Sequence, residues 1–238
     1  MKNIILIFAL FLFYDCNAQK PKKTKDAIQY YNLNQYKDWE YDPEWCWPQE
    51  PCSRENSYFY LMKGNERVRV WSDDEIIKVE KTNKITPYNF HKSYSSKNKA
   101  LVSEWIEFYR AFTGIDKQYK EDGSLILETD QDKPYKFSIE DMVKKIKEEY
   151  NIDILNKKNV FRFSRYESSE TSETPIYEIW LNTDVFEKWN VYFINGNTGE
   201  TLYRMKMDRY ENKIPMEEYL KSIGKFKGPS PKYDPSTD

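Results

Sequence analysis

The chain has 238 residues, with 37 Lys and Arg, 39 Asp and Glu, and a formal net charge of −2 at pH 7. A nearly neutral chain has no overall field that would attract nucleic acid, so we expect no nucleic-acid partner. The length allows one large or two small domains. Tyr occurs 20 times and Gly only 7 times, which favours half-exposed sheet surface over an apolar helical bundle.

The N-terminal residues 1–18 have the pattern of a secretory signal peptide. A short basic start is followed by an almost wholly apolar run at 4–14 and then by a small residue, Ala18. Such a run is too short to span a bilayer as a helix. We therefore expect cleavage between Ala18 and Gln19, a secreted or periplasmic protein, and no transmembrane segment in the mature chain.

Cys16 offers an alternative N-terminus. If it were lipidated as the new first residue, the protein would be an outer-membrane lipoprotein with a lipid anchor. The residues before a lipidated Cys are usually small, and here Asp15 directly precedes Cys16. We therefore prefer simple secretion, and both alternatives place the protein in or beyond the cell envelope.

Residues 19–57 form an aromatic-rich segment in which we expect irregular structure. Between residues 30 and 47, Tyr and Trp alternate with acids and amides. Such unspaced aromatics usually cover a neighbouring sheet, although a surface for stacking carbohydrate or peptide is the alternative. Cys46 and Cys52 are close enough for a disulfide in an oxidising compartment. Their spacing is not Cys-x-x-Cys and no His lies nearby, so a redox pair or half a metal site is not favoured.

Residues 58–137 predict a β-hairpin-rich part. The pairs Gly64-Asn65 and Asp122-Gly123 each lie between extended segments, as hairpin turns do. The other extended segments and the loops follow from β-branched and aromatic runs and from Pro, Ser, Lys and Asn. We expect strands at 58–62, 68–71, 76–80 and 105–109, and loops at Pro87 and 93–99.

Residues 138–224 predict an amphipathic helix followed by strands. Ser138 can cap a helix over 139–150, and Asp141 three residues later completes a capping box. Asn151 is a suitable left-handed stop. We expect strands at 160–166, 176–181, 189–194 and 200–207, a short helix at 215–223, and a disordered tail at 225–238. The fold class is therefore α+β: a β-hairpin-rich N-terminal part, then an amphipathic helix packed on an antiparallel sheet.

The stretch 138–207 resembles a PepSY domain. That family pairs an amphipathic helix with an antiparallel sheet whose last hairpin has an Asp/Asn-x-x-Thr-Gly-Glu turn, which here is matched by Asn195, Thr198, Gly199 and Glu200. The loops at 167–175 and 182–188 depart from the family pattern. The resemblance implies an exported protein, and some members restrain peptidases. It assigns no binding residue here.

Residues 90–129 are similar to MORN-type hairpin repeats. The unit is 119–125, which runs from Tyr119 through Gly123 to Leu125. An earlier copy at 94–101 lacks the Gly, so a repeat array is not established. The order of elements along the whole chain is similar to that of exported bacterial proteins without an assigned activity.

The chemistry of known catalytic sites is largely missing. His91 is the only His, which excludes a zinc site built from several His ligands, and no Gly-x-Ser-x-Gly elbow accompanies the serines near it. We expect His91 at the surface or on a strand edge. The acidic clusters 73–75 and 130–132 have the character of solvated turns and lack the spacing of a calcium loop. We assign no catalytic, cofactor-binding or metal-binding residue, and we expect no cofactor.

These observations favour a non-catalytic protein that binds another protein or a peptide. Exposed Tyr and Trp suit such contacts, and a strand edge in the C-terminal part could accept a peptide as an added strand. One alternative is an acid/base glycan hydrolase that uses Asp73 or Asp130. A third is an immunity-type protein whose MORN-like hairpins neutralise a toxin.

Overall fold

The computed structural model describes residues 28–46, 52–168, 173–226 and 228. Over these residues the fold is α+β as predicted, with an eight-stranded and a four-stranded antiparallel sheet and two α-helices. The β-hairpin-rich part and the helix-plus-sheet part therefore do not share one sheet. No helix in this part of the chain is long and apolar enough to cross a membrane. The expected signal peptide, its cleavage point at Ala18 and Gln19, Cys16 and the end of the tail lie outside the described residues.

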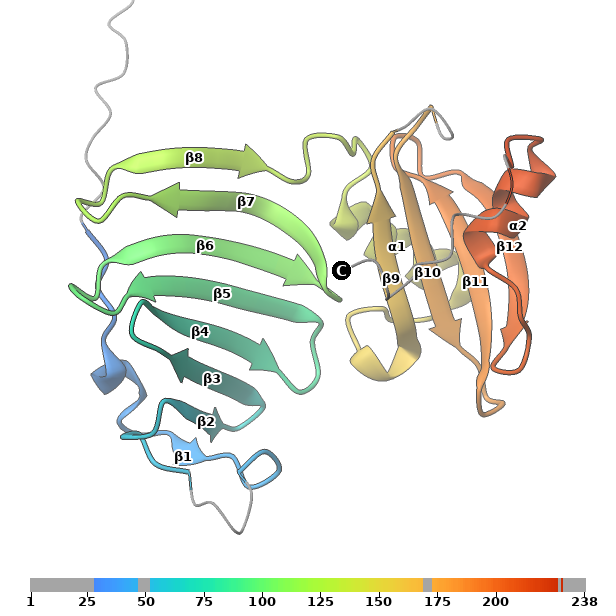
Figure 1. Ribbon diagram of the computed structural model, residues 1–238. Helices are drawn as coiled ribbons and strands as arrows, with labels where there is room; N and C mark the ends of the chain where they lie inside the picture. Colours follow the sequence, from blue (N-terminus) through green and yellow to red (C-terminus); the bar gives the residue numbers. More distant parts are fainter. Residues whose placement is uncertain (1–27, 47–51, 169–172, 227, 229–238) are drawn as a thin grey trace, which may run out of the picture.

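The large sheet is a meander in which each strand pairs with the next one along the chain (Figure 1). Both predicted Gly turns are present, with φ +61° at Gly64 and +76° at Gly123. The strands are β1 (Glu40–Tyr41), β2 (Tyr58–Lys63), β3 (Glu66–Ser72), β4 (Ile76–Asn83), β5 (Tyr88–Ser95), β6 (Leu101–Phe108), β7 (Ala111–Tyr119) and β8 (Leu125–Asp130).

Strand β5 corrects the expectation of a loop at 93–99. Ser93 and Ser95 belong to this strand and are 2% and 6% exposed. β5 lies between β4 and β6 and pairs with both. An interior strand receives ladder hydrogen bonds on both sides, and these outweigh the weak β-propensity of Ser and Lys. Only the residues after Ser95 form the turn.

The N-terminal segment covers one face of the large sheet. Tyr36, at the end of the short 3₁₀ helix η1 (Leu33–Tyr36), is buried against a core of Phe59, Leu61 and Val68. The guanidinium of Arg54 donates hydrogen bonds to the carbonyl oxygens of Tyr36 and Trp39 at 2.7 and 3.0 Å. The predicted aromatic cover is therefore present where the segment is described.

The predicted disulfide between Cys46 and Cys52 is present, with a Cα–Cα distance of 5.5 Å. This distance lies within the usual range for a disulfide. The bond closes the loop that follows the aromatic cover, so it fixes the end of that segment beside β2, where Cys46 lies near the Tyr60 carbonyl.

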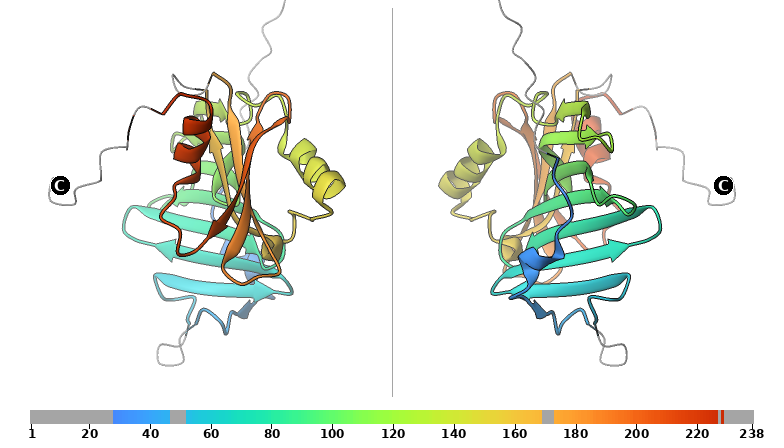
Figure 2. Two further views of the ribbon diagram at one scale, coloured as in Figure 1. Left: turned by 90° about the vertical axis from the view of Figure 1, so that its right-hand side faces the viewer. Right: turned by 90° about the vertical axis from the view of Figure 1, so that its left-hand side faces the viewer.

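The small sheet lies between two helices. Figure 2 shows α1 (Ile139–Tyr150) on one face of this sheet and α2 (Pro215–Ser222) on the other. The capping box at the start of α1 is confirmed, because Asp141 N donates to Ser138 Oγ at 3.0 Å and Ser138 N donates back to the Asp141 carboxylate at 3.1 Å. The strand order is β12 (Thr201–Asp208), β11 (Lys188–Asn195), β10 (Ile176–Asn182) and β9 (Val160–Tyr166).

The turn at 195–199, which carries the PepSY-like motif, holds the start of α1 on the small sheet. Gly199 has φ +74°, and a Cβ there would collide with the ring of Phe137. Phe137 N donates to the carbonyl of Gly196 at 2.9 Å, and Tyr177 Oη donates to the carbonyl of Phe137 at 2.7 Å. The motif therefore has a packing role that requires Gly at this position.

The two sheets share a hydrophobic core although no strand of one pairs with a strand of the other. Phe108, at the end of β6, is fully buried and packs edge-to-face against Phe163 of β9 with ring centroids 5.0 Å apart. Tyr109 packs beside them, and its hydroxyl donates to the carbonyl of Ile154 at 2.9 Å. Packing between these rings therefore fixes how the two sheets lie relative to each other.

Candidate functional site: a cleft between the two sheets

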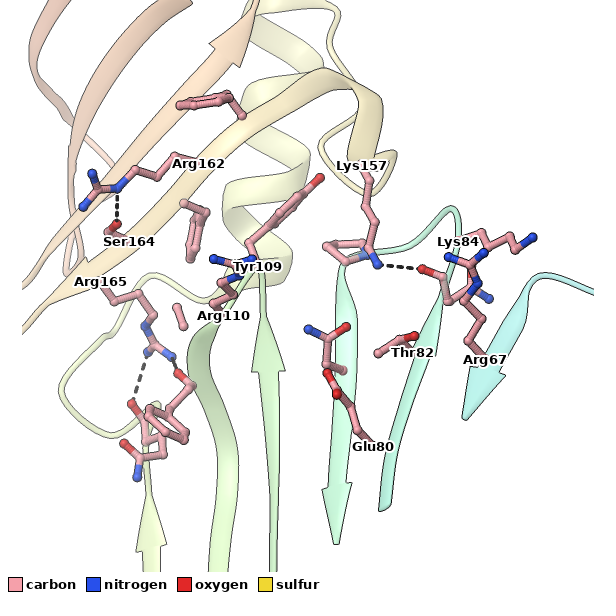
Figure 3. Close-up of a pocket in the computed structure, with 18 of the residues that line it drawn as sticks. Arg67, Glu80, Thr82, Lys84, Tyr109, Arg110, Lys157, Arg162, Ser164 and Arg165 are labelled. Carbon is pink, nitrogen blue, oxygen red and sulfur yellow. Dashed lines mark hydrogen bonds between the residues drawn. The ribbon is translucent and has the colours of Figure 1, made fainter. Parts of the chain in front are cut away.

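An open cleft of about 1340 Å³ lies between the ends of the large-sheet strands and β9. Figure 3 shows side chains from both sheets along it. One wall comes from β3, β4, the start of β5 and the β6–β7 turn, and the opposite wall comes from residues 161–165 of β9. Lys157 is the first residue of the short 3₁₀ helix η2 (Lys157–Asn159), which directly precedes β9 in the chain.

β9 is an edge strand whose outer edge faces this cleft. It pairs with β10 alone, and within the described residues none from 161 to 166 makes a backbone hydrogen bond to any segment other than β10. An edge strand presents a row of unpaired N–H and C=O groups that can pair with another chain. The cleft therefore offers main-chain hydrogen-bonding groups as well as side chains.

The lining of the cleft is more basic than acidic. Six of its side chains are basic and three are acidic, although the whole chain is slightly acidic. The basic residues are Arg67, Lys84, Arg110, Lys157, Arg162 and Arg165, and the acidic residues are Glu44, Glu80 and Glu167.

Two of these cations are neutralised within the large sheet. Arg67 Nε lies 2.6 Å from the carboxylate of Asp42, which is 1% exposed, and Arg67 also contacts Glu44. Lys84 Nζ lies 2.7 Å from Glu44 Oε1. Hydrogen bonds from Lys84 and Arg67 lower the pKa of the exposed Glu44 carboxyl. These four groups carry two positive and two negative charges in contact with one another, so they leave no free charge for a ligand.

Arg165 is a structural link between the two sheets. Its side chain is 5% exposed, and its guanidinium donates to the carbonyl of Phe112 at 2.6 Å and to that of Gln131 at 3.2 Å. It also lies 2.7 Å from Asp132 Oδ1. Because these partners come from β7 and the residues after β8, Arg165 ties β9 to the large sheet.

Arg110, Lys157 and Arg162 have no carboxylate partner among the described residues. Arg162 donates to Ser164 Oγ at 3.2 Å and lies over the ring of Trp180. Within the described part of the chain, Lys157 Nζ donates only to the carbonyl of Asn83, at 2.6 Å. Burial, and then the nearby charge of Arg67, lower the pKa of Lys157 below its ordinary value. In Figure 3, Arg110 and Lys157 flank Tyr109.

Arg110 is held in an unusual backbone conformation. Tyr109 and Arg110 form the two-residue turn between the paired residues Phe108 and Ala111, with φ +52° and +75°. Positive φ at both positions is typical of a type I′ turn, in which Asn and Gly are favoured. The partly buried ring of Tyr109 and the hydrogen bond from its hydroxyl account for the presence of Tyr at this position. Arg110 is exposed and makes no hydrogen bond or ion pair with the described residues, so no such interaction there accounts for its presence in the turn.

A second, smaller pocket of about 600 Å³ adjoins the cleft at Phe161, which lines both. It lies beside the β10–β11 hairpin, where Phe186 is 87% exposed and Val185 is 55% exposed. Trp189 stacks on Phe161 with ring centroids 4.4 Å apart. An apolar side chain of a bound segment could therefore enter this second pocket, beside the end of β9 at which Phe161 lies.

The acidic residues considered for hydrolysis do not line the cleft. Asp73 lies in the β3–β4 turn, where backbone N–H groups of Ile76 and Glu75 donate to it and lower its pKa. Asp130 ends β8 and accepts from Asp132 N at 3.0 Å. In an antiparallel meander the C-terminal ends of β3 and β8 lie at opposite ends of the strands, so the two carboxylates do not face each other.

His91 corrects the expectation of a surface or edge position. It belongs to the interior strand β5, and its side chain is 15% exposed and stacked on Trp105 with ring centroids 4.7 Å apart. Its Nε2 lies 3.3 Å from Glu107 Oε2 but forms no hydrogen bond with it. Among the described residues, no group of three or more His, Cys, Asp or Glu is placed to hold a metal ion.

Comparisons with known proteins assign no family. No family model matches the sequence, and no curated protein matches it. Among solved structures, the Bacillus megaterium YpeB C-terminal domain is similar at 14% identity and a TM-score of 0.19, over 62% of this chain and 92% of that chain. A TM-score this low does not establish a shared fold. The PepSY resemblance therefore stays a prediction, although the helix and sheet on which it depends are present.

The sequence did not single out Arg110, Lys157 or Arg162. Each is one of 37 basic residues and belongs to no motif. The run at 160–166 predicts β9 itself, but nothing in it indicates which side of the sheet would be left unpaired. The one available signal was at 108–111, where a short turn without Gly separates two strands.

Proposed function

We propose that the protein is an exported, non-catalytic protein that binds a peptide or protein partner, and that a segment of this partner lies in the cleft as a strand added to β9. The unpaired edge of β9, inside an open cleft, carries this proposal. Strand addition gives affinity through main-chain hydrogen bonds and specificity through pockets for alternate side chains. The pattern of residues 1–18 and the Cys46–Cys52 disulfide support export.

The dimensions of the cleft support a chain segment as the ligand. Its volume of about 1340 Å³ exceeds the roughly 300–1,000 Å³ of ordinary small-molecule pockets. The competing explanation is that β9 is simply a protected edge, because charged residues such as Arg162 and Arg165 commonly blunt edge strands. The guanidinium of Arg165 is occupied by its contacts to the large sheet, so it does not protect the edge of β9.

Site-specific photo-crosslinking tests the proposal. Phe112 lines the cleft and is 50% exposed, whereas Phe90 belongs to the same sheet, is 46% exposed and does not line the cleft. Benzoylphenylalanine at each position, followed by irradiation in an envelope extract of the source cells, gives a matched pair. We expect a peptide or protein adduct at position 112 and not at position 90.

The adduct, identified by mass spectrometry, should bind again as a synthetic peptide. A version N-methylated at alternate residues should bind at least tenfold more weakly, because it lacks the main-chain donors that pair with β9. The proposal is wrong if positions 112 and 90 give the same adducts, if no adduct forms, or if the pure protein turns over a glycan or a peptide.

A further inference from the structure

We infer that the segment bound in the cleft is acidic, and that Arg110 and Lys157 are the residues that select its carboxylates. The inference rests on the proposed function, because it names the chemical class of the ligand for the same site. It follows from the way in which the cations of the cleft are partnered.

Lys157 has a bonding capacity that the protein does not fill. An ammonium group has three N–H donors, and the only hydrogen bond from Lys157 Nζ within the described residues goes to the carbonyl of Asn83. The group is partly buried and lies near the positive charge of Arg67. A carboxylate in the cleft would supply both the missing acceptor and the missing negative charge.

Arg110 is presented to the cleft by a turn that does not favour it. The backbone at Arg110 has φ +75°, its side chain is exposed, and no hydrogen bond or ion pair within the described residues compensates for the strain. Strained positions persist where the surrounding structure or the function requires them. A guanidinium with free donors can bind a carboxylate in a bidentate manner, so binding a carboxylate of the ligand would explain Arg at this position.

Among the described residues, the acidic residues of the cleft form no ion pair with these cations. Glu44 is held by Arg67 and Lys84. Glu80 lies 3.6 Å from Arg69, and its charge raises the pKa of Lys157 by less than burial and Arg67 lower it. Glu167, exposed after the end of β9, is the remaining acidic residue of the lining. An unpaired positive excess in a concave site attracts acidic chains and repels basic ones.

Fluorescence anisotropy with three labelled decapeptides tests the inference. All three alternate Thr with a second residue, which is Glu in the first peptide, Gln in the second and Lys in the third. At 0.15 M salt we expect the Glu peptide to bind the full-length protein at least tenfold more tightly than the Gln peptide. We expect no binding of the Lys peptide.

Charge reversal in the protein supplies the matched control. The variant R110E/K157E should bind the Glu peptide at least tenfold more weakly than wild type does, and it should bind the Lys peptide. The variant R204E/K206E makes the same charge change at two exposed residues of β12, the far edge strand of the small sheet, and should behave as wild type. If R110E/K157E does not fold, as judged by circular dichroism, R110A/K157M should still lose the preference for Glu over Gln.

Equal binding of the Glu and Gln peptides would overturn the inference and leave strand addition to β9 intact. An unchanged preference in R110E/K157E, or an equal loss in R204E/K206E, would overturn it as well. If none of the three peptides binds, the acidic selection is wrong, and the crosslinking result at position 112 decides the proposed function separately.

Discussion

Replacing Arg110 by Gly should make the protein more stable while weakening ligand binding. Arg110 occupies the second position of the two-residue turn between β6 and β7, at φ +75°. Gly adopts this conformation without the steric cost that a Cβ brings, and it is the residue that such turns favour at this position. Within the described residues the exposed Arg110 side chain makes no hydrogen bond or ion pair that the substitution would remove.

The expected size of the effect follows from two opposing terms. The left-handed conformation costs an L-residue other than Gly roughly 1–2 kcal/mol. Gly gains flexibility in the unfolded chain, which offsets about 0.4–1 kcal/mol of that relief. The balance is a stabilisation of about 1 kcal/mol. For a protein of this size, 1 kcal/mol raises the Tm by about 2–4 °C.

Thermal and urea unfolding of three variants gives the measurement. Arg110→Ala removes the charge but keeps the Cβ, so its unfolding free energy should equal that of wild type. Tyr109→Gly relieves the neighbouring strain but removes buried ring contacts and the hydrogen bond to Ile154, so it should be destabilised. Arg110→Gly and Arg110→Ala should weaken binding of the Glu peptide to the same extent. If Arg110→Gly unfolds more easily than wild type, Arg110 stabilises the fold and the functional explanation of the turn fails.

Four further outcomes are expected. Phe108→Ala should lower the unfolding free energy by about 3–5 kcal/mol because it leaves a cavity in the core between the sheets. Phe90 is half-exposed, so Phe90→Ala should change the unfolding free energy little in the same urea titration. Gly199→Ala should lower the Tm, because the new Cβ meets the ring that anchors α1 and φ is +74°; an unchanged Tm would contradict this packing. The pKa of Lys157 is lowered in the folded state, so just below pH 10.5 the unfolded chain binds more protons than the folded protein. The difference in unfolding free energy between wild type and Lys157→Met (wild type minus variant) should therefore rise with pH in that window. A fall in this difference would refute the pKa shift. Ile126→Lys should reduce concentration-dependent light scattering without changing the Tm, because three consecutive aliphatic residues of the edge strand β8 are exposed; equal scattering would show that this edge does not associate.

Local signals predicted the elements that local chemistry determines. Ser138 and Asp141 fixed the start of α1 and Asn151 its end, because caps satisfy the orphan backbone groups of a helix regardless of the rest of the fold. The turns at Gly64 and Gly123 were predictable for the same reason, since a positive φ next to two extended runs nearly always calls for Gly.

The elements that the sequence did not predict are those set by tertiary contacts. β5 contains Ser and Lys that usually indicate a loop, and it forms a strand because β4 and β6 pair with it on both sides. The turn at Tyr109 and Arg110 lacks Gly, and only the packing of Tyr109 between the sheets explains why the chain bends there. Tertiary packing overrides local preference at both places.

The candidate site shows why a basic residue can be assigned a role only from its partners. Arg165 and Arg110 are indistinguishable in the sequence, yet Arg165 is buried with a carboxylate and two carbonyls, whereas Arg110 is exposed at the end of a strained turn with no partner in the described chain. Removing the first would break its hydrogen bonds to Phe112, Gln131 and Asp132 on the large-sheet side, so its loss should destabilise the contact between the sheets. The second is exposed and forms no hydrogen bond or ion pair within the described residues, so we expect its removal to cost the fold nothing. A charge that the fold does not need, placed beside an unpaired strand edge, is the kind of charge that a ligand would use.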